Sequence, residues 1–227
     1  MNVIKKYLKK QIPKHIIRRI FKSKLGYYHS VSICDNDVAK GDYKDYVGGG
    51  ADRWELRGSF QIYFLKKMGL RHDSKLLDIG CGPIRAGAHF IRYLDEGNYH
   101  GVDYNEDFIK IAERITAEKG LVGKKPTFEV IKNFYFNHIQ PVFDYAILFS
   151  VFNHCHHEQR EHLFRNISTP MKKGGLVYIT HATGFKSYMK NPKLRLTNQF
   201  NYKDFDIIKF GWKRKDQIFP IIELTID

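Results

Sequence analysis

A short run of residues, 75–87 (KLLDIGCGPIRAG), has the composition and spacing of a nucleoside-binding turn. An apolar strand pattern leads directly into Gly80 and Gly82, and glycine can adopt positive φ and let a ligand approach the backbone closely. The next residues predict a helix, whose first N–H groups are not used within the helix and can face a ligand. The strand–turn–helix context gives the glycine pattern its meaning.

A second acidic residue strengthens this interpretation. Asp103 ends the predicted strand YHGVD, 21 residues after Gly82. A carboxylate at the tip of the second strand of an open α/β sheet is placed to accept hydrogen bonds from both ribose hydroxyls of an adenosyl ligand. For Asp78 and Asp103 the alternative is ordinary capping at a strand end.

The departures from the dinucleotide-binding pattern indicate which adenosyl ligand fits. Arg85 stands where the third glycine of GxGxxG would fall, and Pro83 lacks an N–H that a pyrophosphate would use. Asp78 adds negative charge beside the turn, which repels a phosphate and favours the sulfonium and ammonium groups of S-adenosylmethionine. These residues therefore predict S-adenosylmethionine as the cofactor.

Together, LLDIGCGPIRAG and Asp103 resemble the class I S-adenosylmethionine-dependent methyltransferases, and the resemblance covers about residues 52–181. The resemblance implies that Gly80 and Gly82 back the methionine portion of the cofactor, that Asp78 holds its amino group and that Arg85 holds its carboxylate. It also implies that Asp103 holds the ribose, that Ser150 lies at the methyl-transfer cavity, and that the adenine is contacted by Tyr104, Asn133 and Phe134. For Tyr104 the alternative role is core packing, and Arg85 could instead be a solvated helix residue.

One histidine is the candidate catalytic residue. Methyl transfer is an in-line displacement that depends chiefly on alignment, but a hydroxyl acceptor benefits from a base. His154 follows the predicted fourth strand in SVFNHCHH, at the sheet edge where the cofactor should lie. The alternative is a histidine bonded to the backbone at a helix start. We predict no metal site in this cluster, because adjacent residues point in different directions and no second ligand pair stands at zinc spacing.

The remaining pattern predicts the elements that position these residues. Apolar strands alternate with amphipathic helices, which implies a Rossmann-like, doubly wound, mainly parallel sheet covered on both faces. A preceding helix runs from Asp52, its N-cap, to Met68, with Gly69 ending it. The tail should add one helix and a sixth strand, leaving a sheet edge that is shortened or shielded by another subunit. We expect strands near 75–80, 99–103, 127–132, 143–149, 175–181 and 218–226, and helices near 85–94, 106–119 and 157–171.

The N-terminal segment has a distinct charge. Residues 1–30 contain seven Lys, two Arg and no acidic residue, so they contribute +9 of the formal net charge of +14. Apolar residues recur every fourth position and predict a basic amphipathic helix, interrupted by Pro13. Residues 1–24 could dock on an anionic membrane surface or a partner protein, or pack on the domain with their lysines in water. We therefore divide the chain into a basic leader with a glycine-rich loop (1–50, the loop at 41–50) and a methyltransferase domain (51–227).

The location and the acceptor are less constrained. Three cysteines without a CxxC pair, and no run of about 18 apolar residues, predict a cytoplasmic protein, either free or peripheral to a membrane. A hydroxyl of a small molecule or of a sugar or surface-glycan precursor is the first expectation for the acceptor, because no large recognition insert is present. RNA is the second, a protein the third, and a non-catalytic scaffold is the alternative outside enzymes. The basic, aromatic segment after residue 181 either covers the sheet or lines an acceptor pocket.

Overall fold

The computed structural model describes residues 43–46, 53–140, 142–201, 204–205, 210 and 220–227. The chain divides into two compact units, Met1–Ser32 and Ile33–Asp227, and every described residue belongs to the second. The predicted helix at 1–24 lies outside the described residues. So do the glycines of the predicted loop and most of the helix expected in the tail. The domain boundary at residue 50 stays a prediction.

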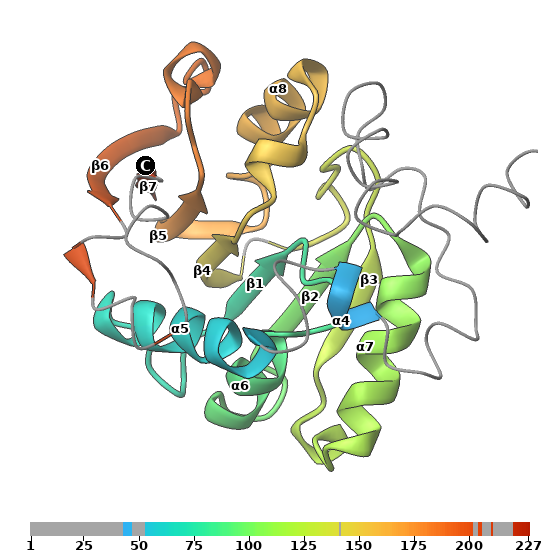
Figure 1. Ribbon diagram of the computed structural model, residues 1–227. Coiled ribbons are helices and arrows are strands. Elements are labelled where there is room, and N and C mark those ends of the chain that lie inside the picture. The colour runs from blue at the N-terminus through green and yellow to red at the C-terminus, as the bar shows by residue number, and fades with distance from the viewer. Residues whose placement is uncertain (1–42, 47–52, 141, 202–203, 206–209, 211–219) are drawn as a thin grey trace, which may run out of the picture. The chain divides into compact units, whose positions relative to one another are not determined.

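A seven-stranded sheet forms the centre of this unit, with the order β3-β2-β1-β4-β5-β7-β6 (Figure 1). Strands β1 to β5 run parallel, and β7 lies antiparallel between β5 and β6. The predicted Rossmann-like, mainly parallel sheet is confirmed. The strands are β1 (Leu76–Ile79), β2 (Tyr99–Asp103), β3 (Thr127–Val130), β4 (Phe143–Leu148), β5 (Met171–Thr180), β6 (Leu194–Asn201) and β7 (Pro220–Ile226).

Two of these strands differ from the prediction. β6 was not expected, so the sheet has seven strands and the prediction of a shortened edge was wrong. Most of its side chains are exposed or half-buried, as suits an edge strand. Leu194, Leu196 and Phe200 stand at alternate positions, but the polar Asn198 and a register shift between Leu196 and Asn198 interrupt the alternation. β5 begins at Met171 and not at the predicted residue 175. The prediction missed the first residues of this strand because residues 172–174 are exposed and lack the apolar pattern of a buried strand. The predicted helix 157–171 ends accordingly at Asn166.

Helices cover both faces of the sheet. In Figure 1, α5, α6 and α7 lie on one side and α8 on the other. The expected N-cap Asp52 was wrong: Arg53 occupies that position and makes no side-chain capping bond. The predicted loop at 41–50 contains a short helix, α4. Gly69, at φ +97°, follows the end of α5 as predicted. The helices are α4 (Tyr43–Tyr46), α5 (Trp54–Lys67), α6 (Gly87–Tyr93), α7 (Glu106–Glu118) and α8 (His157–Asn166), with short 3₁₀ helices η2 (Val122–Lys124), η3 (Phe152–His154) and η4 (Phe185–Tyr188).

Side chains alternate between the two faces of the sheet along β1, and this decides on which face Asp78 lies. Leu77 and Ile79 belong to a buried cluster that includes Phe164 of α8. Successive strand side chains point to opposite faces, so Asp78 faces away from α8. On that side Tyr99 donates its hydroxyl hydrogen to Asp78 Oδ2 at 2.8 Å. Asp78 is therefore held inside the layer formed by the sheet, α5 and α6.

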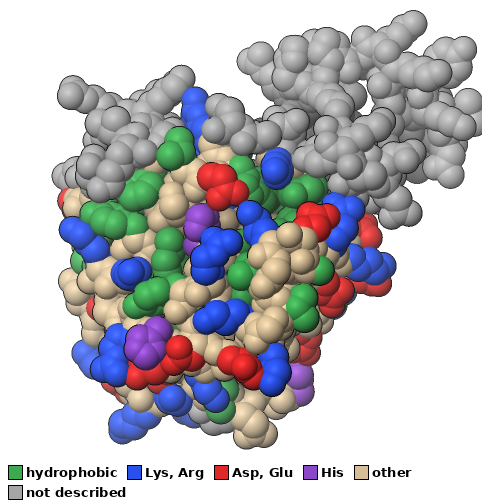
Figure 2. Space-filling view, turned by 90° about the horizontal axis from the view of Figure 1, so that it is seen from below, with side chains coloured by type: hydrophobic (Ala, Val, Ile, Leu, Met, Phe, Trp, Pro, Cys, Tyr) green, Lys and Arg blue, Asp and Glu red, His purple; other side chains and the backbone are tan. Residues whose placement is uncertain are grey.

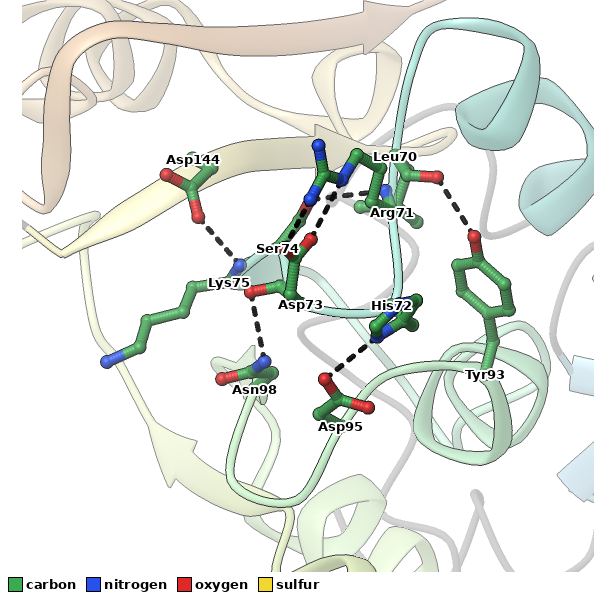
Figure 3. A network of polar contacts seen from close by, with 10 residues as sticks. All are labelled: Leu70, Arg71, His72, Asp73, Ser74, Lys75, Tyr93, Asp95, Asn98 and Asp144. Carbon is green, nitrogen blue, oxygen red and sulfur yellow. Dashed lines mark hydrogen bonds and ion pairs between the residues drawn. The ribbon is translucent and has the colours of Figure 1, made fainter.

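The segment before β1 is fixed by polar contacts at the amino end of the strand (Figure 3). The hydroxyl of Tyr93 donates to the carbonyl of Leu70 at 3.2 Å. The backbone N–H of Lys75 donates to Asp144 Oδ2 of β4 at 2.8 Å. These bonds join α6 and β4 to the start of β1, so the strand that carries the glycine turn is anchored at its far end.

The surface seen from below in Figure 2 is of mixed charge. Lys and Arg side chains are interspersed there with acidic and apolar ones and form no single cationic patch. In the part of the chain that the structure describes, no helix is long and apolar enough to cross a membrane.

Candidate cofactor and methyl-transfer site

The glycine turn at the carboxyl end of β1 has open space above it. Gly80 and Gly82 adopt φ of +74° and +54°, the region that favours glycine. Apart from its two neighbours in the chain, no described residue has an atom within 4 Å of a Cβ built on Gly82. The helix predicted near 85–94 is α6, which begins at Gly87, five residues after Gly82. The backbone of the turn itself is therefore what a ligand could approach.

Asp103 is joined directly to this turn. Its Oδ2 accepts a hydrogen bond from the N–H of Gly82 at 2.9 Å, and its Oδ1 accepts one from the N–H of Asn105 at 2.9 Å. The side chain is buried, and burial raises the pKa of Asp103 to about 6 although backbone N–H groups and Lys132 act against the rise. A carboxylate oxygen can accept more than one hydrogen bond, so Asp103 can hold the turn and bind ribose hydroxyls together.

A second buried carboxylate lies beside it. Burial raises the pKa of Asp78 to about 7; the hydrogen bond from Tyr99 and the charge of Arg85 oppose the rise, and the charge of Asp103 adds to it. Arg85 is only 8% exposed, so its alternative role as a solvated helix residue was wrong. It lies in the turns between Gly82 and α6, close enough to influence the Asp78 carboxyl.

The residues predicted to contact adenine follow β2 and β3. The N–H of Ile131 donates to the carbonyl of Asp103 at 2.9 Å, so the ends of the two strands are adjacent. Tyr104 and Phe134 are half-buried, Asn133 is exposed, and Phe134 packs against the core cluster. The structure thus brings the three residues to the same sheet edge as Asp103. Their contact with adenine stays a prediction.

Lys132 was not predicted as part of this region. Its Nζ donates to the carbonyl of Tyr104 at 2.6 Å and lies 5.8 Å from the centre of the Tyr104 ring. Lys132 therefore fixes the segment after β2, and its charge also acts on Asp103. Its position at the end of the predicted third strand was the only signal in the sequence.

The exit of β4 packs on the glycine turn. A Cβ on Gly80 would lie 2.4 Å from Cγ2 of Val151, so this position has room only for glycine. Ser150 precedes Val151 and adopts φ +62°. His154 ends η3 and is exposed, and Asn153 Nδ2 lies 3.3 Å from its Nε2. Ser150 and His154 therefore come to the edge of the sheet where the turn lies, as the prediction requires.

A second histidine at this edge was missed by the sequence analysis. His181 directly follows β5, and its Nδ1 lies 3.2 Å from Thr180 Oγ1 and 3.4 Å from Ser150 Oγ. Burial and the charge of His154 lower the pKa of His181 to about 4. Its place at the end of a predicted strand, like that of Asp103, was a signal that could have been used.

The neighbouring Cys155 is not placed for chemistry at this site. Burial raises the pKa of Cys155 to about 12, so its thiol is not ionised near neutral pH. Among the described residues, no group of three His, Cys, Asp or Glu side chains could hold a metal ion.

The geometry fits S-adenosylmethionine better than a dinucleotide. Two buried carboxyl groups, Asp78 and Asp103, lie beside an open glycine turn. Cationic groups bound there would stabilise the ionised carboxylates, whereas a pyrophosphate would be repelled by them. The open space over Gly82 lets a ligand reach the backbone.

A sequence-family comparison agrees with this geometry. Residues 77–177 match the family described as "Methyltransferase domain". Residues 77–177 are therefore a methyltransferase domain. The matched region of this methyltransferase contains the glycine turn, Asp103 and the exit of β4. It is accordingly an enzyme whose cofactor is S-adenosylmethionine.

Solved structures share the fold of this methyltransferase at low sequence identity. A TehB-like SAM-dependent methyltransferase from Corynebacterium glutamicum is 18% identical with a TM-score of 0.57, covering 85% of this chain and 97% of that one. The PH0226 protein from Pyrococcus horikoshii is 14% identical with a TM-score of 0.61, covering 86% and 100%. The [4+2]-cyclase SpnF is 13% identical with a TM-score of 0.60, covering 74% and 81%. These likenesses support the fold and leave the acceptor open.

Proposed function

We propose that this enzyme methylates a hydroxyl group of a small molecule or of a sugar or surface-glycan precursor in the cytoplasm. The observation that carries the proposal is the bond from the Gly82 N–H to Asp103 beside the open turn, because it fixes a ribose-binding carboxylate against a backbone that a cofactor can approach. The exit of β4, which bears His154, packs on the same turn. Cofactor and acceptor sites are then adjacent.

The residues of this chain bind the cofactor, align it with the acceptor and remove a proton from the acceptor hydroxyl. Asp103 accepts hydrogen bonds from the ribose, and Asp78 and Arg85 hold the amino and carboxylate groups of the methionine portion. His154 accepts the proton of the acceptor hydroxyl as the new oxygen–carbon bond forms. S-adenosylmethionine supplies an electrophilic methyl group, and S-adenosylhomocysteine is the product that leaves. The proton is held on the imidazole until it passes to water.

RNA is the second candidate acceptor, and its supporting observation is the +9 charge of residues 1–30. On the one face that Figure 2 draws, Lys and Arg side chains are interspersed with acidic and apolar ones. The same basic segment could instead hold the enzyme near an anionic membrane surface or a partner protein. A small acceptor therefore remains our first proposal.

The cofactor and the acceptor class can be tested separately. Calorimetry should show binding of S-adenosylmethionine and S-adenosylhomocysteine and none of NAD. Transfer from methyl-labelled S-adenosylmethionine into a cell extract, fractionated into small molecules, RNA and protein, should place the label in the small-molecule fraction. Label in RNA would replace the first acceptor proposal with the second, and absence of label from every fraction would remove both.

The Asp103→Ala variant tests the proposed ribose contact. Loss of its hydrogen bonds should weaken S-adenosylmethionine binding by about 1 to 3 kcal/mol, measured by calorimetry. Asp95→Ala is a matched control, because Asp95 pairs with His72 in an exposed contact away from the turn. Unchanged affinity in Asp103→Ala would exclude that carboxylate from the site.

A further inference from the structure

The ends of β2 and β3 are joined by a lysine side chain beyond the last paired residues of the two strands. The strands lie side by side and run parallel (Figure 1), with Asp103 opposite Val130, and the N–H of Ile131 donates to the carbonyl of Asp103 at 2.9 Å. One residue further along each segment, Lys132 Nζ donates to the carbonyl of Tyr104 at 2.6 Å. A side chain therefore continues the bonding between the two segments after the strands have ended.

The position of the Asp103 carboxylate depends on the same segment after β2. One carboxylate oxygen accepts a hydrogen bond from the N–H of Asn105 and the other from the N–H of Gly82, each at 2.9 Å. Tyr104 lies between Asp103 and Asn105 in the chain. The bond from Lys132 therefore holds the middle of the segment that carries both the carboxylate and one of these donors. A shift of this segment would move the carboxylate relative to the glycine turn.

The turn that follows Lys132 has a constrained backbone. Asn133 and Phe134 are consecutive, and both adopt positive φ, +53° and +57°, although neither is glycine. Backbone conformations of this kind persist only where surrounding contacts hold them. The N–H of Tyr135 donates to the carbonyl of Lys132 at 3.2 Å, and Phe134 packs against the buried cluster. Lys132 is thus bonded through its own carbonyl to this turn and through its side chain to the exit of β2.

The chemistry of lysine suits a contact of this kind. Its ammonium group carries three donors on a flexible stem, and a hydrogen bond from a charged donor is shorter and stronger than one from a neutral donor. The Lys132 side chain is exposed, so its loss should change the free energy of unfolding little. The bond to Tyr104 therefore serves the placement of the segment more than the stability of the fold.

We propose that Lys132 is a positioning residue for S-adenosylmethionine, because its bond to the Tyr104 carbonyl fixes the exits of β2 and β3 to each other. That bond sets the place of the Asp103 carboxylate on one side and of the turn that presents Asn133 on the other. The inference rests on the proposed ribose contact of Asp103 and adds the residue that keeps this carboxylate in place. Lys132 acts on cofactor binding and takes no part in the transfer of the methyl group.

The charge and the bond of Lys132 affect cofactor binding with opposite signs. At pH 8 Asp103 is ionised, because its pKa is about 6. Removal of the lysine charge alone would then strengthen binding of the cationic cofactor, since one repulsive charge is lost. Loss of the bond to Tyr104 would weaken binding, because the carboxylate is no longer held in place. Weaker binding at this pH therefore indicates positioning.

Calorimetry of the full chain at pH 8 measures this sign. Lys132→Met keeps the apolar stem but removes the donors, and it should weaken S-adenosylmethionine binding about three- to tenfold. Lys132→Arg keeps the charge and the donors and should recover most of this loss. Lys125→Met is the matched control, because Lys125 precedes β3 in an exposed pair with Glu96, and its affinity should stay within about twofold of wild type. Equal or tighter binding by Lys132→Met would overturn the inference.

A double-mutant cycle tests whether Lys132 acts through Asp103. Lys132→Met should weaken binding clearly less in Asp103→Ala than in the wild type, because the carboxylate that the lysine positions is already absent. Equal fold-losses in the two backgrounds would overturn this inference and leave the ribose contact in place. Unchanged affinity in Asp103→Ala alone would instead remove the proposed ribose contact, and this inference with it.

Discussion

Two buried carboxyl groups set the electrostatics of the site. Asp78 and Asp103 are 4% and 7% exposed, and burial raises the pKa of both, to about 7 and about 6. Each also makes a hydrogen bond that keeps it in place. The two groups therefore lie where a cationic cofactor would bind, but their burial makes each carboxyl harder to ionise while no cofactor is present.

Cofactor affinity should therefore depend on pH. As pH falls through about 7 and then about 6, Asp78 and Asp103 become protonated, and a protonated carboxyl no longer attracts a cation. We expect S-adenosylmethionine affinity to fall about tenfold or more between pH 8 and pH 5, measured by calorimetry. Asp78→Asn should weaken binding at pH 8 and remove the upper part of this dependence. Affinity that does not change with pH would contradict the pKa assignments.

Linkage gives the opposite sign for the ligand-free protein. Because the folded state holds these protons more tightly than the unfolded state, its stability should decrease as pH rises from about 4 to about 7. This cost is the physical reason to expect S-adenosylmethionine to stabilise the fold most strongly at the upper end of that range.

At the level of elements, the glycine turn and the β4 exit act as one contact. Val151 occupies the space that a side chain on Gly80 would need, so β1 and β4 end in register with each other. Positive φ at Gly80 and the close approach of Val151 are two separate requirements for glycine. They can be separated by mutation.

A comparison of Gly80→Ala with Gly97→Ala isolates the close approach. Both glycines have nearly the same φ, +74° and +76°, but a Cβ on Gly97 would meet no atom of the other described residues within 4 Å, its two chain neighbours aside. Gly97→Ala should therefore cost about 1 kcal/mol of unfolding free energy from backbone strain alone. Gly80→Ala should cost about 1 to 3 kcal/mol more and weaken cofactor binding. Equal losses, measured by denaturant unfolding and calorimetry, would contradict the packing described here.

On the scale of the whole molecule, the far side of the sheet is held by a buried polar group. Tyr178 of β5 donates to Glu223 Oε2 of β7 at 2.6 Å, and Thr197 of β6 donates to Glu223 Oε1 at 2.8 Å. Tyr178 is fully buried, and burial together with Glu223 raises its pKa. One carboxyl group thus joins the three strands that extend the sheet beyond β4.

Glu223→Ala should destabilise the fold by about 2 to 4 kcal/mol, because the Tyr178 hydroxyl would be left buried without an acceptor. Thermal or denaturant unfolding measures this loss. Glu96→Ala serves as control, since Glu96 forms an exposed pair with Lys125 and should change stability by about 0.5 kcal/mol or less. A similar small effect for Glu223→Ala would contradict its structural role.

Deletion of residues 1–32 tests whether the basic segment serves the site. All the site residues belong to the unit Ile33–Asp227, so S-adenosylmethionine affinity should stay within about twofold of that of the full chain. Co-sedimentation with anionic vesicles, or salt-sensitive binding to RNA, should be lost if this segment makes that contact. A large loss of cofactor affinity would place the segment in the site.

Local pattern in the sequence determined the glycine turn, the acidic residue that ends β2 and the positions of the five parallel strands along the chain, because strand ends and turns are specified by neighbouring residues. It did not reveal β6, an edge strand whose apolar alternation is short and is interrupted at Asn198. Nor could it show that Arg85 is buried, that Val151 fills the space at Gly80, or that His181 meets Ser150 and Thr180. Those contacts join residues distant in the chain, and only the packing of parallel strands brings their carboxyl ends to one edge.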